Sequence, residues 1–221
     1  MEKPEIHSLI SALQEVAIAA DAPHMKAYMK HRFEFIGVKS QARKQASKEF
    51  IDLALGSKDL DAAWVGELWA SPYRELQYVA MDYLARTKRF WQPHHLQLFR
   101  GLILTRSWWD TVDFLASTCV GGVIKKYPEL VDDMDAWNAD ENMWSIRTSI
   151  LYQLKYKESV DTDRLSRYIL AHRDSNEFFI QKAIGWALRQ YAKFDPFWVK
   201  GFVDTHDLAA LSRREAMKHL S

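Results

Sequence analysis

The residues most able to do chemistry lie between Ser107 and Asp113, in the sequence SWWDTVD. If Ser107 caps a helix here, Trp109 is the second residue of that helix and Asp113 lies one turn later on the same face. An aromatic ring beside a carboxylate can act on a positively charged group, because both attract cations. Arg147 and Trp186, on later predicted helices, are candidates for the same site.

Each of these residues also has a structural interpretation. A tryptophan on an apolar stripe belongs to the core more often than to a site, and Asp113 can pair with an arginine instead. The same holds for Arg147 and Trp186. The residue types alone leave both interpretations open.

Several other kinds of site are excluded because their motifs are missing. The sequence has no glycine-rich phosphate loop, no paired cysteines for zinc and no serine nucleophile elbow. The acidic residues 132–135 lack the glycine and the terminal glutamate of a calcium loop. His94 and His95 are adjacent, so on a helix they point about 100° apart and cannot bind one ion together. We therefore expect no metal and no cofactor.

The elements that position the candidate residues are predicted to be helices throughout. Nearly every segment has apolar residues at the helical spacing, and none has the sustained alternation of a strand. Clear examples are residues 145–157, with Ile146, Ile150 and Leu154 on one stripe, and residues 178–192. The fold class is expected to be all-α.

Capping residues and glycines mark the ends of these helices. Helix N-caps are expected at four positions, namely Ser71, Ser107, Asp195 and Ser212. Gly37 and Gly56 fit helix C-termini. The pair Gly121 and Gly122 falls inside a predicted helix, where glycine is unfavourable.

Pairs of helices begin at regular intervals, near Ser40, Ser71, Ser107, Asp140 and Ser175. A repeat of roughly 32 to 36 residues is typical of an α-α superhelix or solenoid, in which helical hairpins bury their apolar faces against their neighbours. Two amphipathic segments before residue 37 would form a starting unit, and about twelve to fourteen helices are expected. No glycine-serine linker divides the sequence, so we predict one domain over residues 1–221, with a concave binding wall.

The composition is that of an ordinary globular protein, with 48% hydrophobic and 27% charged residues in a chain of 221. The single cysteine, Cys119, fits a reducing compartment. The first residues lack the pattern of an export signal, and no apolar run reaches the roughly 18 residues of a membrane span. We expect a cytoplasmic monomer that does not contact membranes.

The charges are nearly balanced in number but unevenly distributed. Residues 26–48 contain seven basic residues and one acid, and residues 83–109 contain five basic residues and no acid. Residues 128–143 carry six acids and no lysine or arginine. A basic face on a nearly neutral protein would attract a polyanion, although charged blocks are also common on solvated helix faces.

Four motifs in order resemble one known family. They are residues 107–113, residues 142–157, residues 178–193 and residues 211–219, and residues 28–37 add to the similarity. Together they look like the AlkD family of HEAT-like-repeat DNA glycosylases, over nearly the whole chain. The resemblance implies an α-helical solenoid that holds duplex DNA in a cationic concave cleft. It also implies release of positively charged alkylated purines, such as 3-methyladenine and 7-methylguanine.

The resemblance assigns roles residue by residue. The essential aspartate of the family falls on Asp113, its active-site tryptophans on Trp109 and Trp186, and its arginine on Arg147. The early helix that approaches the minor groove falls on residues 23–35. The family is thought to act without flipping the target base into a pocket, which many glycosylases do.

The basic residues of the predicted cleft are expected to bind phosphates, which position a duplex without reading its sequence. The expected DNA contacts are Tyr28, Lys30, Arg32, Lys39, Arg43, Lys44, Arg106, Lys182, Arg189, Arg213 and Arg214. Two alternatives to a glycosylase stay open. One is a non-catalytic module that binds damaged or branched DNA, and the other is a protein-binding scaffold, which would not show salt-dependent DNA binding.

Overall fold

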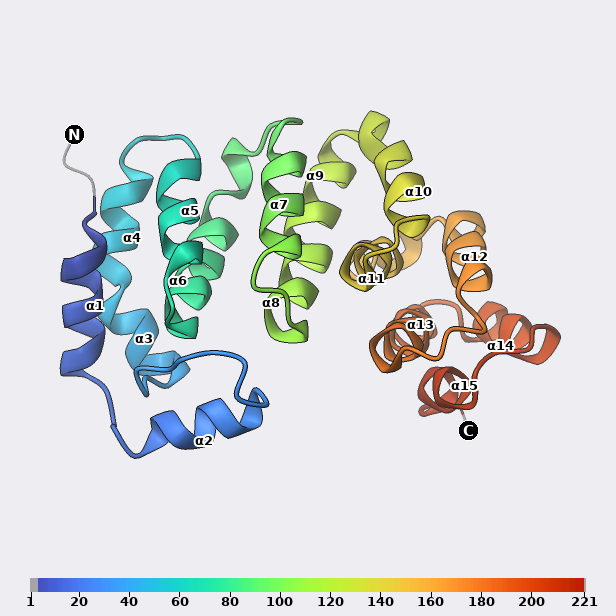
Figure 1. Ribbon diagram of the computed structural model, residues 1–221. Helices are drawn as coiled ribbons and strands as arrows, with labels where there is room; N and C mark the ends of the chain where they lie inside the picture. The colour runs from blue at the N-terminus through green and yellow to red at the C-terminus, as the bar shows by residue number, and fades with distance from the viewer. Residues whose placement is uncertain (1–3, 221) are drawn as a thin grey trace. The chain divides into compact units, whose positions relative to one another are not determined.

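Helices make up all the regular structure in the part of the chain that the structure describes. The computed structural model describes residues 4–220, which contain fifteen α-helical segments and no β-strand (Figure 1). Because the π-helical segment η2 joins α8 to α9 without a break, the helices can also be counted as fourteen. The predictions of an all-α fold and of about twelve to fourteen helices are confirmed. No helix in this range has both the length and the apolar character needed to cross a membrane.

The helices form two compact units, residues 4–92 and residues 93–220. The first unit contains α1 (Ile6–Glu15), α2 (Asp21–Tyr28), α3 (Ser40–Ala46), α4 (Lys48–Leu55), α5 (Ala62–Ala70), α6 (Arg74–Arg86) and the 3-10 helix η1 (Lys88–Phe90). The α-helices of the second unit are α7 (His95–Leu104), α8 (Trp109–Phe114), α9 (Gly121–Lys126), α10 (Asp133–Asn138), α11 (Met143–Leu151), α12 (Thr162–Ala171), α13 (Phe178–Tyr191), α14 (Pro196–Thr205) and α15 (Ala210–Met217). Its shorter segments are η2 (Leu115–Val120), η3 (Pro128–Asp132) and η4 (Lys157–Ser159). The single domain expected from the sequence stays a prediction.

The repeat read from the sequence is present in the order of helices. The helices α3, α6, α8, α11 and α13 each begin within three residues of an expected unit start. In the second unit, α11 packs on α10 and α13, and α13 packs closely on α15. Each helix therefore buries its apolar face against its neighbours in the array, as helical repeats do.

The first unit begins with one amphipathic helix, not with the two expected before residue 37. The helix α1 buries Leu9 and Leu13, whereas α2 buries no residue and carries Tyr28 with 67% of its surface exposed. Figure 1 shows α2 running crosswise to α1. The prediction of a second amphipathic segment is wrong, because the side chains of α2 contribute nothing to the buried core.

A buried carboxylate anchors the segment that follows α2. Glu75, in the first turn of α6, accepts hydrogen bonds of 2.9 to 3.2 Å from the backbone N–H groups of residues 36–38. Gly37 has a φ of 100°, and a Cβ atom there would lie 2.6 Å from the Ile18 carbonyl oxygen. The prediction that Gly37 ends a helix is wrong. α2 has already ended at Tyr28, and glycine is needed here for the positive φ and the close approach to the Ile18 carbonyl.

The helix ends agree with the sequence at two of the predicted positions. Asp195 accepts a hydrogen bond of 2.9 Å from the backbone N–H of Trp198 and caps α14, as predicted. Gly56 is the C-cap of α4, also as predicted. Asp61, Asn142 and Asp161 cap α5, α11 and α12 in the same way, and the sequence analysis did not identify them.

The three serines predicted as N-caps do not cap helices. The Ser107 hydroxyl donates to the Ile103 carbonyl oxygen at 2.6 Å, so that α8 begins after Trp108 and Trp109 is its first residue. Ser212 lies inside α15, and its hydroxyl donates to the Gln181 carbonyl oxygen. Ser71 ends α5 instead of beginning α6. These predictions are wrong because each serine occupies a position other than the N-cap of the predicted helix.

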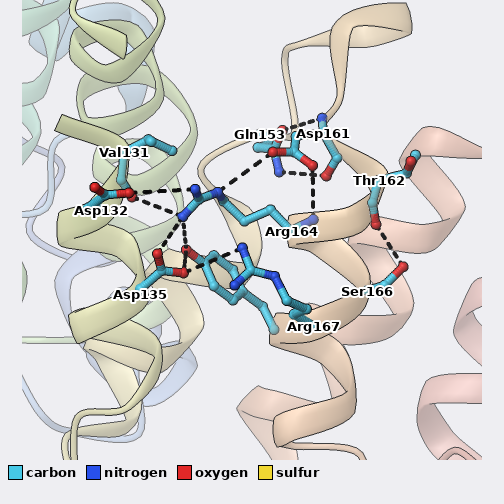
Figure 2. Close-up of polar contacts among 10 residues, drawn as sticks. Val131, Asp132, Asp135, Gln153, Asp161, Thr162, Arg164, Ser166 and Arg167 are labelled. Carbon is cyan, nitrogen blue, oxygen red and sulfur yellow. Dashed lines mark hydrogen bonds and ion pairs between the residues drawn. The ribbon is translucent and has the colours of Figure 1, made fainter. Parts of the chain in front are cut away.

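A network of charges joins α12 to the acidic segment around α10, as Figure 2 shows. Arg164 of α12 donates to Asp135 of α10 at 2.7 Å, and the Tyr168 hydroxyl donates to the same carboxylate at 2.8 Å. The Arg164 and Tyr168 donors hold the pKa of Asp135 below its usual value, against the opposing effect of desolvation. The cluster of acidic residues at positions 128–143 is thus partly neutralised by an arginine of the next repeat.

A close approach at Gly121 fixes the spacing between the helix that carries Asp113 and the helix that carries Arg147. A Cβ atom at Gly121 would lie 2.1 Å from the carbonyl oxygen of Tyr152, the residue that ends α11. The Tyr156 hydroxyl donates to the Gly121 carbonyl oxygen at 2.8 Å. The glycine that looked unfavourable inside a helix is therefore explained by helix packing.

Replacing Gly121 should loosen this contact. We expect Gly121→Ala to lower the free energy of unfolding by about 1–3 kcal/mol, because backbone atoms must move to admit the methyl group. Gly101, inside α7, is the matched control, since a Cβ atom there meets nothing within 4 Å. Gly101→Ala should be neutral or stabilise the protein by about 0.5–1 kcal/mol. Urea unfolding of the two variants checks both values, and equal stabilities would contradict the packing argument.

Candidate active site

A pocket in the second unit brings the four predicted site residues together. Its volume is about 260 Å³, and its lining comes from α8, α11 and α13. The lining residues are Trp109, Asp113, Arg147, Phe178, Phe179, Lys182, Trp186 and Arg189. Residues up to 80 positions apart in the sequence thus share one cavity, because three successive repeats each present one helix to it.

The polar centre of the pocket is a bidentate ion pair between Arg147 and Asp113. The Nε atom of Arg147 lies 2.7 Å from Oδ1 of Asp113, and its Nη2 atom lies 2.9 Å from Oδ2. The remaining Nη1 atom donates to the carbonyl oxygen of Phe179. The Arg147 side chain is only 4% exposed and that of Asp113 is 17% exposed. Arg147 therefore holds the carboxylate in one orientation and uses its third donor to tie α11 to α13.

Burial and the ion pair act on Asp113 in opposite directions. Desolvation raises the pKa of the Asp113 carboxyl above its usual value, and the hydrogen bonds and charge of Arg147 partly offset this rise. Asp113 is therefore paired with an arginine, as a purely structural role of this residue would require. The same carboxylate also lines an open pocket, so the pairing does not remove it from contact with a ligand.

The two adjacent tryptophans have different environments. Trp108 is buried, and its ring packs against Trp144 and Phe179 at centroid distances of 5.9 and 5.0 Å. Trp109 is only partly buried and faces the pocket, where Trp186 of α13 is also partly buried. Trp108 has extended backbone just before α8 and Trp109 is the first residue of that helix, so the two side chains leave the backbone in different directions, one into the core and one toward the site.

Sequence reasoning did not identify two aromatic residues of the pocket, Phe178 and Phe179. Phe178 begins the segment 178–192 whose apolar spacing predicted a helix, yet it is 57% exposed at the first position of α13. A usable signal was its spacing, because Phe178, Lys182 and Trp186 follow one another at intervals of four residues on one helix face.

Two of the predicted DNA contacts, Lys182 and Arg189, line the same pocket. Lys182 lies 3.0 Å from one carboxylate oxygen of Glu215, and Arg189 lies 2.6 Å from the other. The two cations hold the pKa of Glu215 down at about 2. Glu215 was not identified from the sequence as a site residue, since nothing local relates it to residues more than 25 positions earlier.

The remaining predicted contacts of the second unit lie outside the pocket lining. Arg213 pairs with Asp204 at 3.1 Å and donates to the Val203 carbonyl oxygen. Arg106 and Arg214 are exposed. Arg106 has a φ of 52°, in the turn between α7 and α8. Their role as DNA contacts stays a prediction.

The predicted contacts of the first unit differ in accessibility. Tyr28, Lys30 and Arg32 are exposed at the end of α2 and just after it, and Lys39 is exposed and pairs with Asp21 at 2.9 Å. Tyr28 and Lys39 also line a second pocket of about 270 Å³, which lies within this unit.

Arg43 and Lys44 are neighbours with different exposure. Lys44 is exposed and lies 4.0 Å from the Asp82 carboxylate of α6, whereas Arg43 is only 8% exposed and pairs with the same carboxylate at 3.0 Å. The Arg43 guanidinium also lies 5.1 Å from the centre of the Tyr78 ring. Arg43 therefore joins α3 to α6, and Lys44 is the cleaner probe of DNA contact.

Comparison with known proteins identifies the family to which the chain belongs. The family model described as DNA alkylation repair enzyme matches residues 9–220. The chain is also similar to the solved structure of a predicted DNA alkylation repair enzyme from Enterococcus faecalis. The two are 30% identical, with a TM-score of 0.85, over 93% of this chain and 97% of the other. No curated protein gives a significant match. The protein belongs to the DNA alkylation repair enzyme family.

Proposed function

We propose that this protein is a DNA N-glycosylase that releases positively charged alkylated purines, of the 3-methyladenine and 7-methylguanine type, from duplex DNA. The observation that carries the proposal is the Asp113 carboxylate, which Arg147 fixes in a pocket between Trp109 and Trp186. Membership of a DNA repair family supports DNA as the substrate.

The chemistry of the substrate explains why one carboxylate is enough. An alkylated purine carries a positive charge, so the glycosidic bond can break with its electron pair moving to the base, which leaves as a neutral molecule. The charge then lies on the oxocarbenium-like sugar. Water adds to the sugar carbon that carried the base, with loss of a proton. A carboxylate about 4 Å from the cation contributes on the order of 4 kcal/mol at an effective dielectric of about 20. That energy corresponds to roughly a thousandfold in rate.

The other residues of the pocket would position the nucleotide. The faces of Trp109 and Trp186 can hold the deoxyribose and add a modest cation–π attraction. Lys182 and Arg189, on the same face of α13 as Trp186, are placed to bind backbone phosphate. The purified protein should release free base from methylated duplex DNA. Tight DNA binding without release would instead favour a non-catalytic DNA-binding module.

Replacing Asp113 by asparagine tests the carboxylate. Asp113→Asn keeps the shape of the side chain but removes the charge that opposes the sugar cation. We expect DNA binding to survive and single-turnover release of 7-methylguanine to fall by about a hundredfold to a thousandfold. Trp109→Ala and Trp186→Ala should each cost only about tenfold, because they remove a cation–π and positioning contact. Melting temperatures identify any variant that is merely unfolded, and wild-type release by Asp113→Asn would overturn the mechanism.

The pH dependence of release should follow the ionisation of Asp113. Only the ionised carboxylate opposes the sugar cation, and its pKa is raised by burial. Release should therefore fall as the pH falls through this raised pKa, above the ordinary value of 3.8. Arg147→Met removes the donors that favour the charged form, so the acid limb should move to higher pH. Single-turnover rates between about pH 4 and 7, corrected for acid depurination of the DNA alone, check the shift. An unchanged acid limb would show that this ion pair does not control activity.

Binding of duplex DNA should depend steeply on salt. Each neutralised phosphate contributes a slope of about 0.9 to the logarithmic plot of affinity against salt concentration. Lys44→Glu should weaken methylated and unmethylated duplexes alike, since phosphate contacts carry no base information. Lys200→Glu, an exposed lysine outside the predicted contacts, is the matched control. A flat salt titration by fluorescence anisotropy would remove DNA as the ligand.

A further inference from the structure

One carboxylate holds two cations at the pocket. The Nζ atom of Lys182 lies 3.0 Å from Oε1 of Glu215, and Nη1 of Arg189 lies 2.6 Å from Oε2. The same Nη1 atom also donates to the backbone carbonyl oxygen of Glu215 at 2.9 Å. Lys182, Trp186 and Arg189 follow the i, i+4, i+7 spacing of one helix face. The two cations therefore flank Trp186 and share a single anion on α15.

The backbone around Glu215 is fitted to this arrangement. A Cβ atom at Gly185 would lie 2.4 Å from Cβ of Glu215 and 2.9 Å from the Ser212 carbonyl oxygen. The Ser212 hydroxyl donates to the Gln181 carbonyl oxygen at 3.0 Å, which links α15 to α13 a second time. Glycine at position 185 lets α15 approach closely enough for the Glu215 side chain to reach both cations. Backbone contacts between α13 and α15 thus fix the position of the Glu215 carboxylate.

The charges at this side of the pocket do not cancel. Glu215 stays ionised through the neutral pH range, because Lys182 and Arg189 hold its pKa at about 2. Asp113 and Arg147 form a neutral pair, whereas two cations and one carboxylate leave a single net positive charge. One positive charge with several N–H donors matches one phosphodiester group, which carries one negative charge.

We propose that Glu215 is a positioning residue, which holds Lys182 and Arg189 where both bind one backbone phosphate beside the nucleotide being excised. This proposal rests on the proposed function. Lysine and arginine side chains have many rotamers, and ordering them at the moment of binding opposes association. Two cations already fixed by a partly buried partner meet the phosphate without that loss.

Removing the Glu215 charge has two opposite effects that can be separated. A protein without this carboxylate gains one net positive charge, which favours binding of any duplex. It also releases Lys182 and Arg189 from their fixed positions, which weakens the one contact that depends on their geometry. Glu215→Gln should therefore bind ordinary duplex DNA as well as the wild type or better, while losing its preference for one particular phosphate.

A scan of neutralised phosphates measures that preference directly. The probes are duplexes with one central tetrahydrofuran abasic-site analogue and a single methylphosphonate, placed in turn at each phosphate around it. For the wild type, we expect one position at which neutralisation weakens binding about tenfold. The double variant Lys182→Met/Arg189→Gln should show no loss at that position, which identifies it as the phosphate bound by the two cations. If no such position exists, the proposal is wrong.

The same scan tests Glu215 against a matched control. In Glu215→Gln the tenfold loss should shrink to about twofold, and Glu215→Asp, which keeps the charge but shortens the reach, should fall between. Asp135→Asn removes an equal charge from a carboxylate that also pairs with two cations, Arg164 at 2.7 Å and Arg167 at 3.8 Å, outside the pocket lining (Figure 2). This control should keep the full tenfold loss. The proposal is overturned if neutralising this phosphate still weakens binding of Glu215→Gln tenfold. It is also overturned if Glu215→Gln and Asp135→Asn become less sensitive to the neutralised phosphate by the same factor.

Base release is measured separately on methylated duplex. If the wild type releases base, Glu215→Gln should do so about tenfold more slowly at saturating protein, with affinity maintained. An unchanged rate would overturn the positioning role. If the wild type releases no base but the phosphate scan gives the expected pattern, the glycosylase proposal fails and the positioning of the phosphate stands. Melting temperatures confirm that all variants are folded under the assay conditions.

Discussion

The second unit is organised around one requirement, that the charges of Asp113 and Arg147 be paired where little water reaches them. An unpaired charge in such a place is strongly unfavourable, and one missing partner would leave the other uncompensated. Arg147 uses all three of its donor nitrogens, two on the Asp113 carboxylate and one on the Phe179 carbonyl oxygen. These bonds are satisfied only when α8, α11 and α13 lie at fixed distances, so the ion pair and the helix packing require each other.

The aromatic residues around this pair form two layers. Trp108, Trp144 and Phe179 pack with ring centroids 5.0 to 5.9 Å apart, which gives the ion pair a rigid apolar support. Trp109 and Trp186 are only partly buried and line the cavity. The pocket lining therefore combines aromatic rings with four charged side chains, those of Asp113, Arg147, Lys182 and Arg189. For the proposed reaction, this partial burial would strengthen the attraction between Asp113 and the sugar cation, because less water screens a carboxylate that is only 17% exposed.

Two glycines set how closely the repeats approach. Gly121 lets the helix that carries Asp113 touch the end of α11, and Gly185 lets α15 touch α13. In both places a Cβ atom would overlap the neighbouring helix, so the contacts depend on its absence. The first contact sets the spacing between the helices that carry Asp113 and Arg147, and the second brings Glu215 to Lys182 and Arg189. Small residues between helices therefore determine the geometry of charged residues some distance away.

The sequence by itself determined the features that depend on local periodicity and on recognisable motifs. Helical spacing predicted the all-α fold and the repeat, and the resemblance singled out Trp109, Asp113, Arg147 and Trp186. Asp195 was identified as an N-cap from its position before Pro196, and in the structure its carboxylate accepts a hydrogen bond from the backbone N–H of Trp198, three residues later. Such contacts are readable from sequence because both partners lie within one turn of each other.

Only the tertiary structure decided which polar residues face a partner and which face solvent. Arg43 and Lys44 are neighbours with the same charge and both pair with Asp82 of another helix, yet Arg43 is buried and Lys44 is exposed. Ser107 and Ser212 satisfy their hydroxyls on carbonyl oxygens instead of capping helices. Glu215 reaches Lys182 and Arg189 across 26 or more residues of sequence. Hydrogen bonds and ion pairs select partners by distance in space, and helix packing sets that distance.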